Sequence, residues 1–153
     1  ANDRGITVWL KGNRVSRNQI MAIKEESVTD QKNSLTVCLD NILRHAGITR
    51  NTEYDLAQGK TAIQILEENM TGVQVLDLSG CSLDAVLYYV NQDIPVLAIL
   101  EDGEAVLVTG FNEFNVVIME PSTGKLYKKG MNDATTWFAE NGNHFISYMK
   151  IDN

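Results

Sequence analysis

The sequence predicts an α+β fold in a single domain spanning residues 1–153, with N-terminal helices packed on an antiparallel β-sheet. Two observations lead to this prediction. In the first half of the chain, apolar residues recur at the three- and four-residue spacing of amphipathic helices, whereas in the second half they form short runs separated by turn residues. A chain of 153 residues, 44% of them apolar, is also long enough to bury one hydrophobic core.

The strongest helical pattern covers residues 33–47. Its apolar residues fall on one face, Asn33 or Ser34 can cap the free backbone N–H groups at its start, and Gly47 suits its end. Ahead of this helix, residues 5–12 alternate between apolar and polar types, which predicts an edge strand or a half-buried strand.

Four shorter helices are also expected. One begins near Thr52, and the next begins at Thr61, where Thr61 and Gln64 can form a capping box. A third starts at the cap Ser82 and continues through LDAVLYYV. A fourth, also capped, covers residues 132–140.

The β-rich part of the chain consists of short apolar runs that end at turn residues. The expected strands are residues 73–78, 95–100, 105–111, 115–120, 125–129 and 144–151. Because the runs between residues 95 and 120 are joined only by the short turns DG and NEFN, we expect them to form an antiparallel meander.

Charge and hydropathy exclude several classes of partner. The formal net charge of -7 and the scattered positions of the 13 Lys and Arg residues argue against nucleic acid as a ligand. No window approaches the roughly 18 consecutive apolar residues that a membrane-spanning helix needs. The chain begins with ANDRG and without Met, so we expect it to be processed or excised from a longer protein with flanking domains.

Cys38 is the first candidate for chemistry, because it lies near the start of the strongest helix. Unpaired N–H groups and the helix dipole can lower the pKa of a thiol at such a position. The alternative is that Cys38 fills an apolar helix position, as buried free cysteines do. Cys81 is interpreted as a small buried residue. The two cysteines can form one disulfide in an oxidising compartment, or both can remain free.

A nucleophilic thiol needs a base, and the chain has only two histidines. His45 lies two helical turns beyond Cys38, about 10 Å away, which is too far for a hydrogen bond. His144 begins the last strand and can in principle face the helix, although a solvated side chain is the alternative. The spacings of the His and Cys residues match no zinc pattern, so we expect neither a metal nor a cofactor.

Gln31 lies seven residues before Cys38, and the later segments PVLAIL, GEAVLVTGFN and MEPSTG follow in order. From about residue 31 onward this arrangement resembles the bacterial C39-like cysteine peptidase domain, which has a papain-like fold. In that family a Gln precedes the nucleophilic Cys, the Cys opens the main helix, and a strand pair with the pattern G-H-x-V-h-h-x-G-[YF]-[DN] closes with D-P.

The resemblance implies a role for each matching position. Gln31 matches the oxyanion-stabilising Gln and Cys38 the nucleophile. Glu104 stands where the family carries its general-base His, and Glu120 stands where it carries the Asp that orients the His. Leu39 also follows Cys38 where active members usually have Gly. Because a carboxylate beside a thiol raises the pKa of the thiol, these departures predict that peptidase catalysis is lost.

The sequence therefore favours a catalytically inactive C39-like domain that binds a peptide or a protein segment, such as part of its own parent chain. The resemblance also implies a bacterial exported or surface protein with an extracytoplasmic or membrane-associated location. Two alternatives remain open. One is an active papain-like cysteine peptidase that uses Cys38 with His144 as its base, and the other is a purely structural module.

Overall fold

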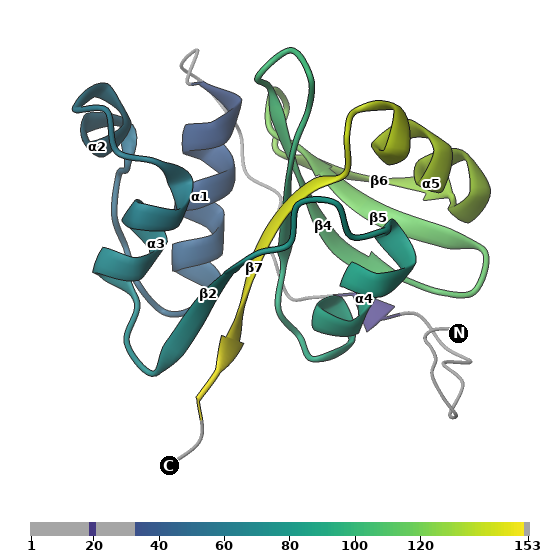
Figure 1. Ribbon diagram of the computed structural model, residues 1–153, viewed down its shortest axis with the longest axis horizontal. Helices are drawn as coiled ribbons and strands as arrows, with labels where there is room; N and C mark the ends of the chain where they lie inside the picture. Colours follow the sequence, from purple (N-terminus) through teal and green to yellow (C-terminus); the bar gives the residue numbers. More distant parts are fainter. Residues whose placement is uncertain (1–18, 21–32, 152–153) are drawn as a thin grey trace.

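A computed structural model describes residues 19–20 and 33–151 (Figure 1). The helices are α1 (Ser34–His45), α2 (Glu53–Ala57), α3 (Ala62–Asn69), α4 (Leu83–Asn91) and α5 (Met131–Glu140). The strands are β1 (Gln19–Ile20), β2 (Val73–Asp77), β3 (Val96–Ile99), β4 (Ala105–Phe111), β5 (Asn115–Glu120), β6 (Lys125–Gly130) and β7 (His144–Lys150). The strand expected at residues 5–12 lies outside the described residues.

All strands belong to one antiparallel sheet, in the order β2-β7-β3-β4-β5-β6, with β1 paired to β4. This confirms the predicted α+β class. The strands β3 to β6 follow one another as the expected meander. The last strand, β7, lies between β3 and β2, so the C-terminal part of the chain joins the helical half to the meander (Figure 1).

Helices cover the sheet from two sides. Both α1 and α4 pack against β4 and β3, and α5 packs against β5 and β6. Figure 1 shows α1, α2 and α3 together on one side of β2 and β7, with α4 and α5 on the other. The first helix is thus held between the sheet and α3.

The helix starts agree with the capping residues read from the sequence. Asn33 caps α1 by accepting a 2.8 Å hydrogen bond from the Leu35 N–H. Thr61 and Gln64 form the predicted capping box of α3, and the Ser82 hydroxyl caps α4. The last helix differs from the prediction, because α5 begins at Met131 after Gly130 and has no side-chain cap.

The core surrounds α1, of which residues 36–43 are all buried. Two buried polar side chains of this stretch, Asp40 and Asn41, are hydrogen-bonded. The Asp40 carboxylate accepts 2.8 Å hydrogen bonds from both the backbone N–H and the hydroxyl of Thr52. Just beyond, the Arg50 guanidinium donates two 3.0 Å hydrogen bonds to the Asp55 carboxylate. These contacts fasten α2 and the segment before it to α1.

Candidate functional site

The start of α1 is the part of the molecule where the family resemblance expects catalysis. Asn33 is the cap and Ser34 is the first helical residue, so Cys38 is the fifth and lies on the second turn. The backbone N–H of Val37 already donates a helical hydrogen bond to the Asn33 carbonyl. The unpaired N–H groups and the strongest field of the helix dipole belong to the first turn, and Cys38 lies beyond that turn.

Ser34 joins the start of α1 to the start of β4. Because Asn33 supplies the cap, the Ser34 hydroxyl oxygen is available to accept a 2.8 Å hydrogen bond from the backbone N–H of Ala105. Ala105 is the first residue of β4 and follows Glu104 directly. The hydroxyl of Ser34, which is half-buried, is consequently placed beside the strand that the resemblance expects to carry the base.

Glu104 is held by its backbone in a tight turn. Its carbonyl accepts a 2.8 Å hydrogen bond from the Leu100 N–H, and its own N–H donates a 2.9 Å bond to the Asp102 side chain. Gly103 supplies the positive φ of +86° that this turn requires. The Glu104 side chain is exposed to solvent.

Glu120 ends β5, and the register between β4 and β5 places it near Glu104. Leu107 pairs with Met119, so the preceding residue, Val106, is opposite Glu120. Glu104 lies two residues before Val106, in the turn that precedes β4. Glu104 and Glu120 are thus both at the end of the sheet where β4 begins and β5 ends.

Cys38 is fully buried, with 0% of its surface exposed. Burial, and secondly the negative charge of Glu120, raise the pKa of its thiol far above the ordinary value. The thiol is therefore protonated and inaccessible at neutral pH. The packing of Cys38 among the core residues of α1 is that of an apolar side chain.

The two histidines lie elsewhere. His144 is exposed at the start of β7 and pairs with Ile99, which in turn pairs with Ala105. Two strand spacings, about 10 Å, therefore separate the backbones of His144 and Ala105. His144 instead lines a cavity of about 370 Å³ beside Asp77. His45 ends α1 and contacts Asp93.

Of the remaining predicted site residues, Gln31 lies outside the described residues. Cys38 and Cys81 are both free, so the possible disulfide is absent. Within residues 19–20 and 33–151, no group of three or more His, Cys, Asp or Glu side chains is arranged to hold a metal ion. No helix in the described part of the chain is long and apolar enough to cross a membrane.

Ser34 is the residue that sequence reasoning missed. Asn33 and Ser34 are both good caps, and only the structure shows that Asn33 is the cap and that Ser34 opens the helix. The signal that could have drawn attention to Ser34 is the family rule that the nucleophile opens the main helix, a place that the resemblance assigned to Cys38.

Comparison with solved structures finds the crystal structure of a candidate C39-like peptidase from Bacillus anthracis, with a TM-score of 0.70. The match covers 88% of this chain and 98% of that chain, at 14% sequence identity. No protein-family model matches the sequence, and no curated protein matches it. The chain therefore has a C39-like peptidase fold, as the resemblance implied, and at this identity the likeness concerns the fold alone.

Proposed function

We propose that this chain is a catalytically inactive C39-like domain that holds a peptide or protein segment without cleaving it. The observation that carries the proposal is the contact between the Ser34 hydroxyl and the Ala105 N–H. It supports placing Ser34 at the position of the nucleophile, beside Glu104 at the position of the base. This chain carries a hydroxyl and a carboxylate at the two positions where an active family member carries a thiol and an imidazole.

This substitution removes both halves of papain-like catalysis. An imidazole takes the proton of the nucleophile and later returns it to the leaving amine. A serine hydroxyl is a weak nucleophile at its free pKa and needs such a base. A carboxylate at that position lacks the two ring nitrogens with which an imidazole is oriented by one neighbour while it exchanges a proton with the nucleophile. Turnover would lose at least the roughly 10²- to 10⁴-fold contribution of general acid–base catalysis.

The alternative active enzyme, with Cys38 and His144 as its pair, is not favoured by their positions. The thiol of Cys38 is buried, and His144 is exposed on a strand separated from β4 by β3. The third hypothesis, that the chain is a purely structural module, predicts that no peptide binds at the N-terminal end of α1. A binding experiment therefore separates it from the proposal.

Carboxylates suggest which segments would bind. Glu101, Asp102 and Glu104 are exposed in the turn before β4, and Glu120 lies on the neighbouring strand end. The whole chain also carries a net charge of -7. Opposite charge steers association and fixes orientation, so a segment with Lys or Arg side chains is the expected partner.

The site assignment can be tested by rebuilding the thiol and the imidazole. In the single variant Ser34→Cys the new thiol should react slowly with iodoacetamide at pH 6. In the double variant Ser34→Cys/Glu104→His, an imidazolium beside the thiol should lower its pKa and speed alkylation at that pH by about tenfold or more. Peptide-resolved mass spectrometry separates this thiol from Cys38 and Cys81. Equal rates in the two variants would show that positions 34 and 104 do not meet.

The inactivity and the binding role need two further measurements. The wild-type protein, incubated with a peptide mixture, should yield no new termini by mass spectrometry. Cleavage that disappears in Ser34→Ala, Cys38→Ala or His144→Ala would overturn the proposal. Labelled peptides rich in Lys should bind more tightly than acidic peptides of the same length, and Glu104→Gln/Glu120→Gln should reduce that difference. If neither kind of peptide binds, the structural module is the better description.

A further inference from the structure

A cavity of about 540 Å³ lies at the other end of α1, beside its last residue, His45. Its walls come from four segments: the end of α1, the turn between α3 and β2, the turn between α4 and β3, and the end of β7. The 12 residues of α1 place this cavity about 17 Å along the helix from Ser34. Its volume is in the range of small-molecule sites, so it is a separate candidate site.

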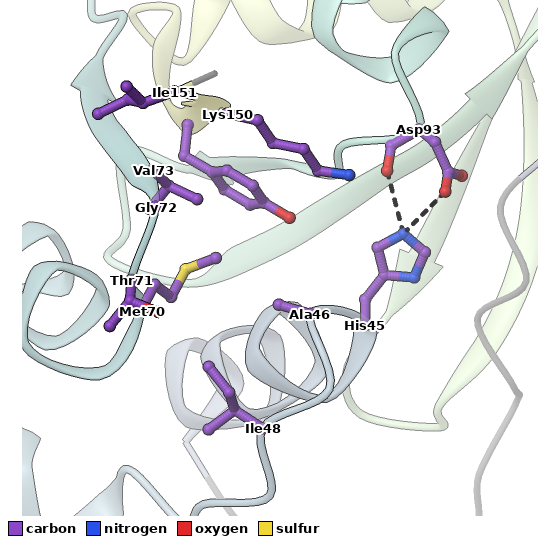
Figure 2. Close-up of a pocket in the computed structure, with 11 residues that line it drawn as sticks. His45, Ala46, Ile48, Met70, Thr71, Gly72, Val73, Asp93, Lys150 and Ile151 are labelled. Atoms are coloured by element: carbon purple, nitrogen blue, oxygen red, sulfur yellow. Dashed lines mark hydrogen bonds and ion pairs between the residues drawn. The ribbon is translucent and has the colours of Figure 1, made fainter. Parts of the chain in front are cut away.

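The lining of this cavity is divided into a charged side and an apolar side. Figure 2 shows the ammonium group of Lys150 extending toward Asp93, with His45 next to them. The other side of the cavity carries the apolar side chains of Ile48, Met70, Val73 and Ile151, with Thr71 and Gly72 between Met70 and Val73 in the chain (Figure 2). A cavity of this kind fits a ligand with a charged head and an apolar tail.

The charged side offers groups of both signs. The Nε2 atom of His45 lies 3.0 Å from the Asp93 carbonyl oxygen and 3.5 Å from Asp93 Oδ2. The side chain of Asp93 is 62% exposed, so its carboxylate has room for a further donor. Lys150 forms no ion pair with any residue in the described part of the chain. One cation and one anion are thus available to a ligand.

One further polar group belongs to this cavity. Asp93 itself follows the C-cap of α4 with a φ of +66°, in the left-handed region that Asp and Asn adopt more readily than most residues. Tyr148, which is 3% exposed, lines the same cavity. Burial, and secondly the charge of Asp93, raise the pKa of Tyr148 above its usual range, so its hydroxyl remains a neutral hydrogen-bonding group.

We infer that this cavity binds a free α-amino acid with an apolar side chain. The carboxylate of the ligand lies at Lys150, its ammonium group lies at Asp93, and its side chain packs on the apolar side of the cavity. Charge-assisted hydrogen bonds at both head groups would fix its orientation. An apolar acid or an apolar amine of the same shape would leave one of the two charged residues without a partner.

Three probes that differ only in their head groups test the inference. They are L-leucine, 4-methylpentanoate, which lacks the ammonium group, and 3-methylbutylamine, which lacks the carboxylate. Each is titrated into the ¹⁵N-labelled chain, and the amide signals of Thr71, Gly72 and Ile151 are followed. L-leucine should bind at least about tenfold more tightly than either analogue, because each loses one charged contact. Equal binding of all three, or no shift with any, would overturn the inference.

Two variants assign the head groups to their partners. Lys150→Met should remove the advantage of L-leucine over 3-methylbutylamine, and Asp93→Asn should remove its advantage over 4-methylpentanoate. Asn also tolerates a positive φ, so the second variant should keep the turn. Lys128→Met, an exposed lysine on the distant strand β6, is the matched control and should leave all three affinities unchanged. Wild-type preferences in Lys150→Met would contradict the inference.

Discussion

The two ends of α1 present different chemistry on one rigid element. At the first residue, the Ser34 hydroxyl is bonded to β4, and the nearby charged groups identified above, Glu104 and Glu120, are both carboxylates. At the last residue, His45, groups of both signs surround a cavity of about 540 Å³. The first end is fixed by a hydrogen bond to the sheet, and the second end is open to a ligand.

This difference shows why the fold alone does not assign the function. The C39-like fold places the head of α1 against β4, but the groups at that place decide whether a proton can be taken and returned. Here they are a hydroxyl and a carboxylate. The groups suited to recognising a small zwitterion lie at the opposite end, which the resemblance does not mark.

The largest effect should come from the contact that fixes the middle of α1. Asp40→Ala removes the acceptor of two 2.8 Å hydrogen bonds from Thr52 and leaves those donors unpaired in a buried site. We expect the free energy of unfolding in urea to fall by about 3 kcal/mol. Glu67→Ala, an exposed carboxylate on α3, is the control and should change it by less than about 0.5 kcal/mol.

If Asp40→Ala unfolds like the control, the two ends of α1 are not held by a common anchor. Amide exchange at the Thr52 N–H would then show whether water has replaced the carboxylate. In that case each end of α1 would be stabilised separately, by its own local contacts.

A smaller effect should appear on raising the pH, and it arises from the buried thiol of Cys38. The native pKa is raised by burial, whereas the unfolded thiol titrates near about 8.5. Above that pH the unfolded state loses a proton that the native state keeps, so stability present below pH 8.5 is progressively lost. The free energy of unfolding should fall by about 1 kcal/mol between pH 8.5 and 9.5 through this group.

Cys38→Ala isolates this contribution, because the variant cannot titrate at residue 38. Its absolute stability will be lower owing to the deleted sulfur, so the slopes with pH are compared and not the values themselves. Equal slopes in the two proteins would mean that Cys38 reaches solvent, which would reopen its interpretation as a nucleophile.

Much of the fold could be predicted from local sequence. The period of the apolar residues located α1, and the side chains of Thr61, Gln64 and Ser82 located the starts of α3 and α4, because these signals depend on neighbouring residues. The return of β7 between β2 and β3 was not predicted. That pairing joins residues far apart in the chain, and no local pattern specifies it.

The candidate site was harder to predict for the same reason. Asn33 and Ser34 are equally good caps, and the contact that separates them is with Ala105, 71 positions along the chain. The cavity beside His45 likewise depends on four segments that meet only in the folded chain. Residue types indicated the chemistry available, whereas long-range packing decided which groups meet.

The smallest effect should distinguish the two ends of α1 directly. Ser34→Ala leaves the Ala105 N–H without its acceptor, while the Asn33 cap is kept, so the loss should be about 0.5–1 kcal/mol. His45→Ala removes the contact with Asp93 and the packing of a side chain that is only 13% exposed, so a loss of similar size is expected there, without faster exchange at Ala105. Hydrogen exchange locates the first effect, because the Ala105 amide alone should exchange faster in Ser34→Ala. If that amide exchanges at the wild-type rate, the hydroxyl is not what joins the head of α1 to β4.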